Sequence, residues 1–245
     1  NGFVEFIIPV FACQLAQDSE LHQKKLTGEK FLEVKLDGVR VITVLYPNGK
    51  VDMFSRNGKE LTNFNNLQEE LREKIRINTL DEAIVIDGEV VSKNFQELMK
   101  QIHRKEVIQN QDATLFLFDF LPFEKFKDGV YKKTYKLRTL HLKNWYDRFI
   151  KNSDKIKLIE KKIINLDCSE GLSVFRDFNN ESIVQGYEGI MIKDPESFYE
   201  CKRSTTWLKL KPVIEISLEV KDFEEGTGRN AGKLGAIIAE GVDND

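Results

Sequence analysis

The sequence predicts an α+β protein with antiparallel sheets. Many of its short apolar segments alternate with period two or are β-branched, and several are joined by turns too short to hold a crossover helix. Segments with apolar residues at helical spacing lie between them. Strands joined mainly by turns, with helices interspersed, favour this class over a parallel doubly wound sheet. With 245 residues, 41% hydrophobic and 31% charged, the chain can bury a sizeable core.

Three strands are expected first, at residues 31–36, 39–45 and 51–55. The first alternates apolar and polar residues and the second is β-branched. Gly38 lies between these two, and the turn around Asn48-Gly49 precedes the third. We therefore expect a meander of three strands.

A helix, a strand, a second helix and another strand are expected next. Their ranges are residues 66–77, 83–91, 94–103 and 114–121. Leu67, Leu71 and Ile75 lie at spacing four, which makes the first helix amphipathic. Pro122 stops the last strand because it cannot donate to the ladder.

The rest of the first domain is expected to hold three helices and two strands. The helices are residues 137–149, 153–161 and 177–185, and the strands are residues 187–193 and 206–211. Pro212 marks the boundary between a domain of residues 1–211 and a segment of residues 212–245. Two strands, residues 215–223 and 234–240, are expected to flank a Gly-rich loop in that segment.

Charge and cysteine content exclude several classes of protein. The net charge is −3, and residues 212–245 alone contribute −5, so the chain lacks the basic character typical of a nucleic-acid-binding domain. No apolar run is long enough to span a bilayer, and the N-terminal residues do not resemble a secretory signal. Three cysteines without CxxC spacing indicate neither a disulfide framework nor a zinc site.

Charged side chains recur on one face of several predicted strands. Alternation over residues 31–37 places Glu33, Lys35 and Asp37 on one face and Leu32 on the other. Such a pattern alone is also typical of a solvated strand face. The order of the charged segments along the chain is more specific.

Six short motifs follow one another in a fixed order. They are Lys35-Leu36-Asp37-Gly38-Val39-Arg40, Ser55-Arg56-Asn57-Gly58, Asp87-Gly88-Glu89, Phe118-Asp119, Glu188-Gly189-Ile190-Met191-Ile192-Lys193 and Trp207-Leu208-Lys209-Leu210-Lys211. This series resembles the covalent nucleotidyltransferase superfamily, and most closely the ATP-dependent DNA ligases, especially compact bacteriophage or bacterial enzymes. The resemblance covers residues 11–240. It implies a nucleotidyltransferase (adenylation) domain in residues 1–211, followed by the start of an OB-fold β-barrel.

The resemblance implies that Lys35 is the nucleophile, which attacks the α-phosphorus of ATP and forms lysyl-AMP. A free lysine is protonated at neutral pH, so it must lose a proton to attack. Lys209 and Lys211 correspond to cations that meet the phosphate charge growing in the transition state. Glu188 corresponds to a carboxylate that holds a divalent ion, for which Mg²⁺ is suited.

The same resemblance assigns further ATP-binding residues. Glu33 corresponds to the residue that accepts from the exocyclic amine of adenine, and Phe118 to the aromatic ring that stacks on the base. Arg40 and Glu89 correspond to positions that hold the ribose hydroxyls. Arg56 and Arg203 correspond to positions that contact phosphates of the nucleotide or the nick, and Lys193 is a further ATP-binding residue.

The implied partner is nicked duplex DNA, whose 5′-phosphate receives AMP before the 3′-hydroxyl displaces it. A monomer in the cytoplasm of a bacterial cell or phage-infected host is expected. No helical DNA-binding domain precedes the motifs, which indicates a minimal or shortened ligase. The lysine-rich segments at residues 132–133 and 155–162 are interpreted as solvated faces, and the three isolated histidines as structural.

Other functions share this lysine chemistry. An RNA ligase or a GTP-using capping nucleotidyltransferase is the alternative among enzymes, and a non-catalytic nucleic-acid-binding relative is the alternative outside them. Glu33 and the Gly-rich segment after Pro212 favour a DNA ligase, and an intact Lys35 argues against a non-catalytic relative. An NAD-dependent ligase does not fit, because the sequence has no four-cysteine zinc site.

Overall fold

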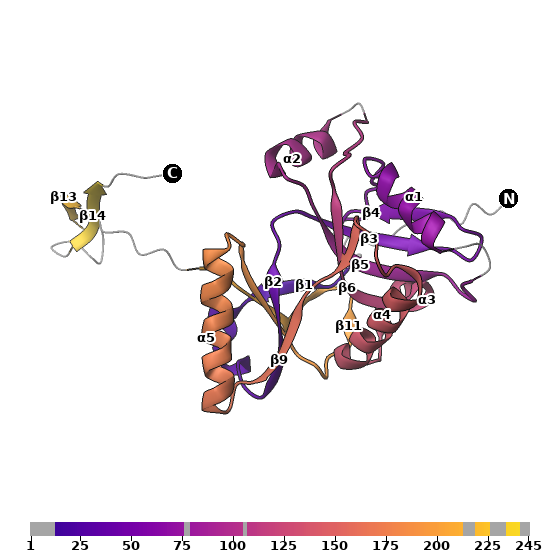
Figure 1. The fold of residues 1–245 in the computed structure, drawn as a ribbon. Helices are drawn as coiled ribbons and strands as arrows, with labels where there is room; N and C mark the ends of the chain where they lie inside the picture. The colour runs from indigo at the N-terminus through magenta and orange to yellow at the C-terminus, as the bar shows by residue number, and fades with distance from the viewer. Residues whose placement is uncertain (1–12, 76–78, 105–106, 213–218, 226–233, 241–245) are drawn as a thin grey trace. The chain divides into compact units, whose positions relative to one another are not determined.

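The computed structural model describes residues 13–75, 79–104, 107–212, 219–225 and 234–240. The chain divides into two compact units, Asn1–Lys211 and Pro212–Asp245, which are considered separately. The first unit combines two largely antiparallel sheets with outer helices, so the predicted α+β class is confirmed (Figure 1).

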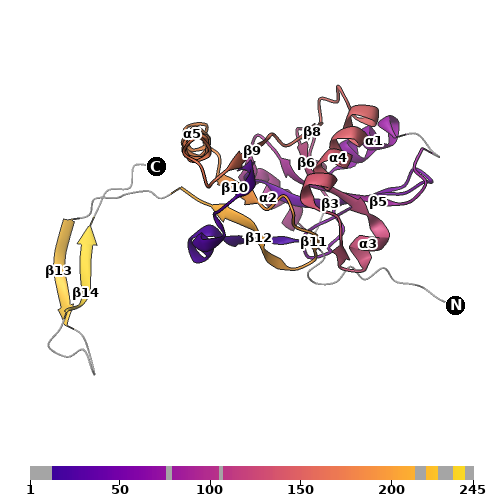
Figure 2. The ribbon, with the colours of Figure 1, turned by 90° about the horizontal axis from the view of Figure 1, so that it is seen from below.

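One five-stranded sheet contains the strand that carries Lys35. Its strands in spatial order are β1 (Leu15–Asp18), β12 (Arg203–Leu210), β10 (Gly189–Lys193), β2 (Glu29–Lys35) and β9 (Lys161–Asn165). All neighbouring strands are antiparallel except β1 and β12. Helix α5 (Ser169–Val184) packs along this sheet, where Phe178 joins a cluster with Leu32 and Ile190 (Figure 2).

The second five-stranded sheet is covered by helices on its outer face. Its strands in spatial order are β4 (Val51–Phe54), β3 (Val39–Leu45), β5 (Ile84–Val91), β6 (Thr114–Pro122) and β8 (Ile156–Leu158). The helices that share its core are α1 (Asn65–Lys74), α2 (Phe95–His103) and α4 (Tyr135–Phe149). Leu71, Leu98 and Trp145, one from each helix, belong to one buried cluster with strand residues such as Val41.

A separate apolar cluster joins the two sheets. It combines Ile42 and Phe118 of the second sheet with Leu15 and Trp207 of the first. Trp207 is 1% exposed, and its ring lies edge-on to that of Phe118 with centroids 5.7 Å apart. Short elements complete the unit: the 3₁₀ helix η1 (Ser19–Lys25), helix α3 (Phe123–Lys127) and the strand pair β7 (Val130–Tyr131) and β11 (Tyr199–Glu200).

The expected three-stranded meander is wrong in its first step. Strand β2 pairs with β9 and β10, whereas β3 pairs with β4 and β5, so the chain passes from one sheet to the other at Gly38. A Cβ on Gly38 would lie 2.1 Å from the carbonyl oxygen of Val90. The glycine thus permits a close backbone approach at the seam between the sheets rather than a hairpin turn.

The helix expected at residues 153–161 is also wrong, because that segment contributes to strands β8 and β9. Ser153 accepts hydrogen bonds from the amides of Lys155 and Ile156, and the next residues pair with β6. Here pairing to an existing sheet outweighs local propensity. The helix expected at residues 177–185 is instead the second half of α5, which begins at Ser169 after the cap provided by Cys168.

The second unit contains strands β13 (Glu219–Glu225) and β14 (Leu234–Glu240), which form an antiparallel pair. Both expected strands are thus present, although residues 215–218 and the loop at 226–233 lie outside the described residues, as do residues 76–77 of the first expected helix. Within the described part of this unit, no further strand closes a barrel.

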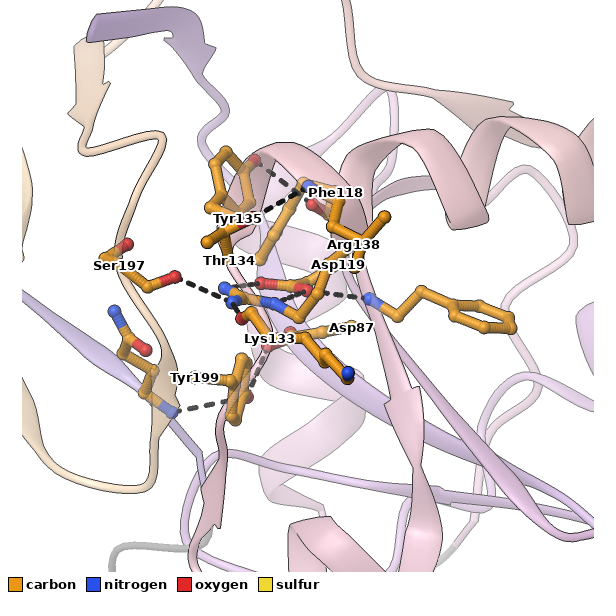
Figure 3. Close-up of polar contacts among 12 residues, drawn as sticks. Asp87, Phe118, Asp119, Lys133, Thr134, Tyr135, Arg138, Ser197 and Tyr199 are labelled. Carbon is orange, nitrogen blue, oxygen red and sulfur yellow. Dashed lines mark hydrogen bonds and ion pairs between the residues drawn. The ribbon is translucent and has the colours of Figure 1, made fainter.

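A buried ion pair connects helix α4 to strand β6 of the second sheet. The Arg138 guanidinium donates to both carboxylate oxygens of Asp119, at 2.8 and 3.1 Å, and both side chains are fully buried. The Nη1 group of the same guanidinium donates to the carbonyls of Lys133 and Ser197 (Figure 3). The pair therefore fixes α4 against β6.

We expect Asp119→Ala to lower the free energy of unfolding by about 3–5 kcal/mol, because it leaves Arg138 charged and buried without its partner. Urea denaturation followed by circular dichroism measures the change. Asp147→Ala is the matched control, since Asp147 lies on the same helix, α4, in an exposed ion pair with Lys143. That change should cost less than about 1 kcal/mol. Equal costs for the two variants would contradict the assigned role of the buried pair.

Candidate active site

A cavity of about 730 Å³ lies in the first unit and collects the predicted site residues. Its walls come from strands of both sheets, including β2, β10 and β12 of the first and β3, β5 and β6 of the second. Every residue assigned from the sequence lines it except Lys211: Glu33, Lys35, Arg40, Arg56, Glu89, Phe118, Glu188, Lys193, Arg203 and Lys209. Six motifs that are far apart in sequence therefore meet in one place.

Lys35 is held at the end of β2 by the carboxylate of Glu188. Its Nζ lies 2.6 Å from Oε2 of Glu188, whose Oε1 lies 3.4 Å from Nζ of Lys211. Pairing of β2 with β10 sets this arrangement, because Lys35 is opposite Gly189. Gly189 has φ +151° and no room for a Cβ, which would lie 2.2 Å from the carbonyl oxygen of Leu210.

Positive charge surrounds this pair. Lys209 lies on β12, the strand that pairs with β10. Burial together with the charges of Lys211, Lys35 and Arg203 lowers the pKa of Lys209 below its ordinary value. Burial acts to raise the pKa of Glu188, but the hydrogen bond and charge of Lys35 and the charge of Lys211 hold it below its ordinary value. Lys35, Lys211 and Arg203 thus lie near Lys209, and two of them contact Glu188, so this cluster of cations is suited to an anionic group such as a phosphate chain.

Arg40 is engaged in a second buried ion pair. Its guanidinium donates to the two carboxylate oxygens of Asp87 at 2.5 and 2.6 Å, and the Tyr199 hydroxyl donates to Asp87 at 2.7 Å. Burial would lower the pKa of Arg40, but Asp87 raises it well above its ordinary value. Arg40 thus remains charged on the cavity wall, with its guanidinium carbon 5.2 Å from the Phe118 ring centroid.

Glu89 lies opposite Arg40 in the β3–β5 ladder and also lines the cavity. Burial raises its pKa to about 7, against the opposing charges of Arg40 and Lys35. Among the cavity carboxylates, Glu89 is therefore the one that changes its charge near neutral pH.

Glu33 is 1% exposed and belongs to a network that was not anticipated. Lys161 donates to its Oε2 at 2.8 Å, Lys193 donates to its Oε1 at 2.9 Å, and the Tyr135 hydroxyl donates to Oε2 as well. Burial acts to raise the pKa of Glu33, but the charges of Lys161 and Lys193 outweigh it and the pKa is lowered. The carboxylate is therefore ionised although it is buried.

Two members of this network, Lys161 and Tyr135, could not be recognised from the sequence. Lys161 was interpreted as part of a solvated segment, whereas its side chain is 12% exposed and burial lowers its pKa to about 8. Its neighbour Lys162 is exposed, as expected. No local signal separates the two lysines, because only the pairing of Lys161 with Glu33 across β9 and β2 buries one of them.

The two remaining predicted arginines are exposed at the cavity rim. Arg203 donates to the carbonyl of Ala16 at 2.9 Å, and Arg56 follows strand β4. Both guanidinium groups keep donors available for a ligand of the cavity. No group of three or more His, Cys, Asp or Glu side chains suited to a metal occurs among the described residues.

Comparison with known proteins identifies a family. Residues 9–211 match the ATP dependent DNA ligase domain. A DNA ligase of Methanothrix thermoacetophila is 28% identical over 245 residues, covering 94% of this chain and 41% of that protein. DNA ligase 2 of Methanosarcina acetivorans is 29% identical, with 94% and 40% covered. The chain thus spans about two fifths of the length of these curated relatives.

Solved structures agree with the fold. A structure titled Pmar-Lig_PreS3 is 46% identical, with a TM-score of 0.82, and covers 99% of this chain and 56% of the other. The ATP-dependent DNA ligase of bacteriophage T7 in complex with ATP has a TM-score of 0.65 at 18% identity, covering 94% and 80%. Among the described residues, no helix is long and apolar enough to cross a membrane.

We expect Glu89→Gln to change the pH dependence of stability. A carboxyl with a pKa of about 7 in the folded state and 4.5 when unfolded stabilises the protein fully below pH 4.5. That contribution is lost as the pH rises through 7. The free energy of unfolding of the Gln variant should therefore rise relative to the parent by about 1–3 kcal/mol between pH 4.5 and 8.

Urea denaturation at the two pH values measures this difference. Glu160→Gln, at an exposed position, is the control and should leave the pH dependence unchanged. A constant difference between the Glu89 variant and the parent across this range would contradict the assignment.

Proposed function

The chain belongs to the family of ATP-dependent DNA ligase domains, and we propose that its Lys35 takes AMP from ATP as the first step in sealing nicks in duplex DNA. One observation carries the proposal: Lys35 lines the cavity, and its Nζ lies 2.6 Å from the Glu188 carboxylate, in the cluster of cations that is suited to an anionic ligand. In that step the amine nitrogen forms a bond to the α-phosphorus of ATP, the bond to the bridging oxygen breaks, and pyrophosphate leaves.

Lys35 must lose a proton before it attacks, and it must point at the phosphorus. Its hydrogen bond to Glu188 holds the amine in one orientation, which supplies the positional part of catalysis. Lys209 lies near the end of β12 and Lys211 just follows that strand, which pairs with β10, the neighbour of β2. Both lysines neutralise charge that grows on the phosphate in the transition state.

The other cavity residues suit the remaining parts of ATP. Phe118 offers a ring face to the adenine, and Glu33 offers an acceptor to its exocyclic amine. Glu89 and Arg40 provide an acceptor and a donor for the ribose hydroxyls, while Arg56 and Arg203 at the rim suit phosphates of the nucleotide or the nick. Lys193 is buried and paired with Glu33, so we assign it to the base rather than to the phosphates.

The residues present fit a magnesium ion only as part of an ATP complex. Mg²⁺ is commonly bound by one or two carboxylates together with substrate phosphates and water. Glu188 is the carboxylate in question, because its side chain is 32% exposed beside the proposed phosphate site. The ion would supply further neutralisation of the phosphate charge.

The proposed macromolecular partner is nicked duplex DNA, for which the relatives named DNA ligase provide the support. We propose that residues 212–245 begin an OB fold, which the antiparallel strands β13 and β14 fit. We also propose that the protein is a monomer and acts in the cytoplasm; three free cysteines and a need for ATP agree with that location.

We expect Lys35→Ala and Lys35→Arg to abolish the AMP adduct, in the second case because a guanidinium stays protonated and cannot attack. Incubation with ATP labelled in the α-phosphate, followed by denaturing gel electrophoresis and peptide mapping, measures the adduct. Lys30→Ala, on the same strand but outside the cavity lining, should label normally. A labelled Lys35 variant would refute the assignment, and an adduct formed with GTP instead would favour the capping alternative.

We expect Lys209→Ala to lower the single-turnover rate of adduct formation by about 10²–10³, with a smaller effect on ATP affinity, because the lysine acts on charge that develops in the transition state. Glu188→Ala should lose activity that added Mg²⁺ does not fully restore. Rapid-quench measurements over a range of ATP concentrations separate rate from affinity. A raised KM with an unchanged rate at saturation would show that Lys209 serves ground-state binding instead.

A further inference from the structure

The network around Glu33 extends behind the cavity wall. Glu33 and Lys193 line the cavity, whereas Lys161 and Tyr135, which hold the same carboxylate, are not among its lining residues. Both are buried or nearly so, with Tyr135 at 0% exposure. Neither side chain is needed for the steps proposed above, so their polar groups require a separate explanation.

The hydrogen bonds of this network leave one acceptor site on the Glu33 carboxylate. An ionised carboxylate offers about four lone-pair sites on two oxygens and can only accept. Lys161 and Tyr135 both donate to Oε2, and Lys193 donates to Oε1. The remaining site is on Oε1, the oxygen that Lys193, itself a cavity-lining residue, also contacts.

The same two side chains also hold the backbone of Phe118. The Tyr135 hydroxyl lies 3.1 Å from the Phe118 carbonyl oxygen, and Lys161 Nζ lies 3.4 Å from it. Lys161 Nζ is further 4.8 Å from the centroid of the Tyr135 ring. Lys161, whose ammonium group has three donors, thus connects the residue proposed for the edge of the base with the residue proposed for its face, while the single hydroxyl proton of Tyr135 goes to Glu33.

We propose that Lys161 and Tyr135 are positioning residues that set the base specificity of the nucleotide site. They fix Oε2 of Glu33 from behind, so that the carboxylate presents a single acceptor on Oε1. A base with an amine at the matching position fills this acceptor, while a base with a carbonyl there brings two acceptors together. The inference rests on the proposed binding of ATP in this cavity.

Lys161 arises from β9, an edge strand that pairs only with β2 in its sheet. Glu33 and Lys161 are directly opposite in the antiparallel register, so their side chains emerge on the same face. Burial lowers the pKa of Lys161 to about 8. The charge of Glu33 opposes this decrease, and the charge of Lys193 adds to it. A lysine kept in so costly a position agrees with a role in orienting its partner.

The test compares ATP with inosine triphosphate, in which a carbonyl replaces the exocyclic amine of adenine. Adduct formation is measured with each nucleotide, labelled in the α-phosphate, on the whole protein and on Lys161→Met and Tyr135→Phe. Each variant removes one donor to Oε2 and keeps most of the volume of the side chain. Lys162→Met is the matched control, because it removes a lysine from the next, exposed position of β9.

In both test variants the preference for ATP over inosine triphosphate, expressed as kcat/KM, should fall by about tenfold, the lower part of the range for mispairing one buried polar group. The KM for ATP should rise while the rate at saturating ATP stays the same, since the base lies away from the reacting phosphorus. The control should match the parent in both respects.

An unchanged preference in folded variants would overturn the inference while ATP adduct formation, and with it the proposed function, still stands. Absence of any adduct in the parent protein would instead refute the proposed function. If Lys161→Met fails to fold, as thermal melting would reveal, Tyr135→Phe alone decides between the two results. A fall in the saturating rate without a change in preference would show a general structural role and also overturn the inference.

Discussion

The passage of the chain from one sheet to the other at Gly38 is the constraint on which the site depends. Backbone of the second sheet approaches so closely there that any side chain larger than hydrogen would strike Val90. Because of this crossing, Lys35 is the last residue of β2 in one sheet, and Arg40 is the second residue of β3 in the other. A single short motif thereby contributes residues to the cavity from both sheets.

Buried charge pairs then fix the orientation of these walls. Arg40 is tied to Asp87 within the second sheet, and Arg138 ties helix α4 to the same sheet through Asp119. Such pairs contribute little net stability, since the loss of hydration offsets most of the attraction. Each guanidinium also donates to backbone carbonyls, Arg40 to Gln14 and Arg138 to Lys133 and Ser197, and the bonds of Arg138 are drawn in Figure 3; these added contacts restrict the orientation of both side chains. This order is what a cavity for a polar ligand requires.

The two ends of the cavity differ in how charge is handled. Near Lys35 the charges are partly exposed and positive charge predominates, which suits a mobile, highly charged phosphate chain. Around Glu33 the charges are buried and paired, and aromatic rings surround them, with Lys193 Nζ 4.1 Å from the ring centroids of both Phe118 and Trp207. Such an environment suits a flat, uncharged base that must be read by a few fixed hydrogen bonds. The proposed orientation of ATP follows from this difference.

The α+β class, most strands and the motifs of the proposed site could be predicted from the sequence, because period-two alternation and short motifs are local properties. Lys35, Glu89, Phe118 and Glu188 were found in this way, and all four line one cavity. Sequence alone could not show that β2 and β3 belong to different sheets, since a glycine between two strands is equally typical of a hairpin turn.

Only the tertiary structure decided which of Lys161 and Lys162 has a buried side chain. These neighbouring lysines have the same chemistry, yet one is buried against Glu33 and the other is exposed. The local pattern predicts a helix at residues 153–161 and a solvated face at residues 155–162. Pairing with β2 instead makes residues 161–165 a strand, in which adjacent side chains point to opposite faces. Which face is buried depends on Glu33, a residue more than a hundred positions away, and such a long-range pairing leaves no trace in local spacing.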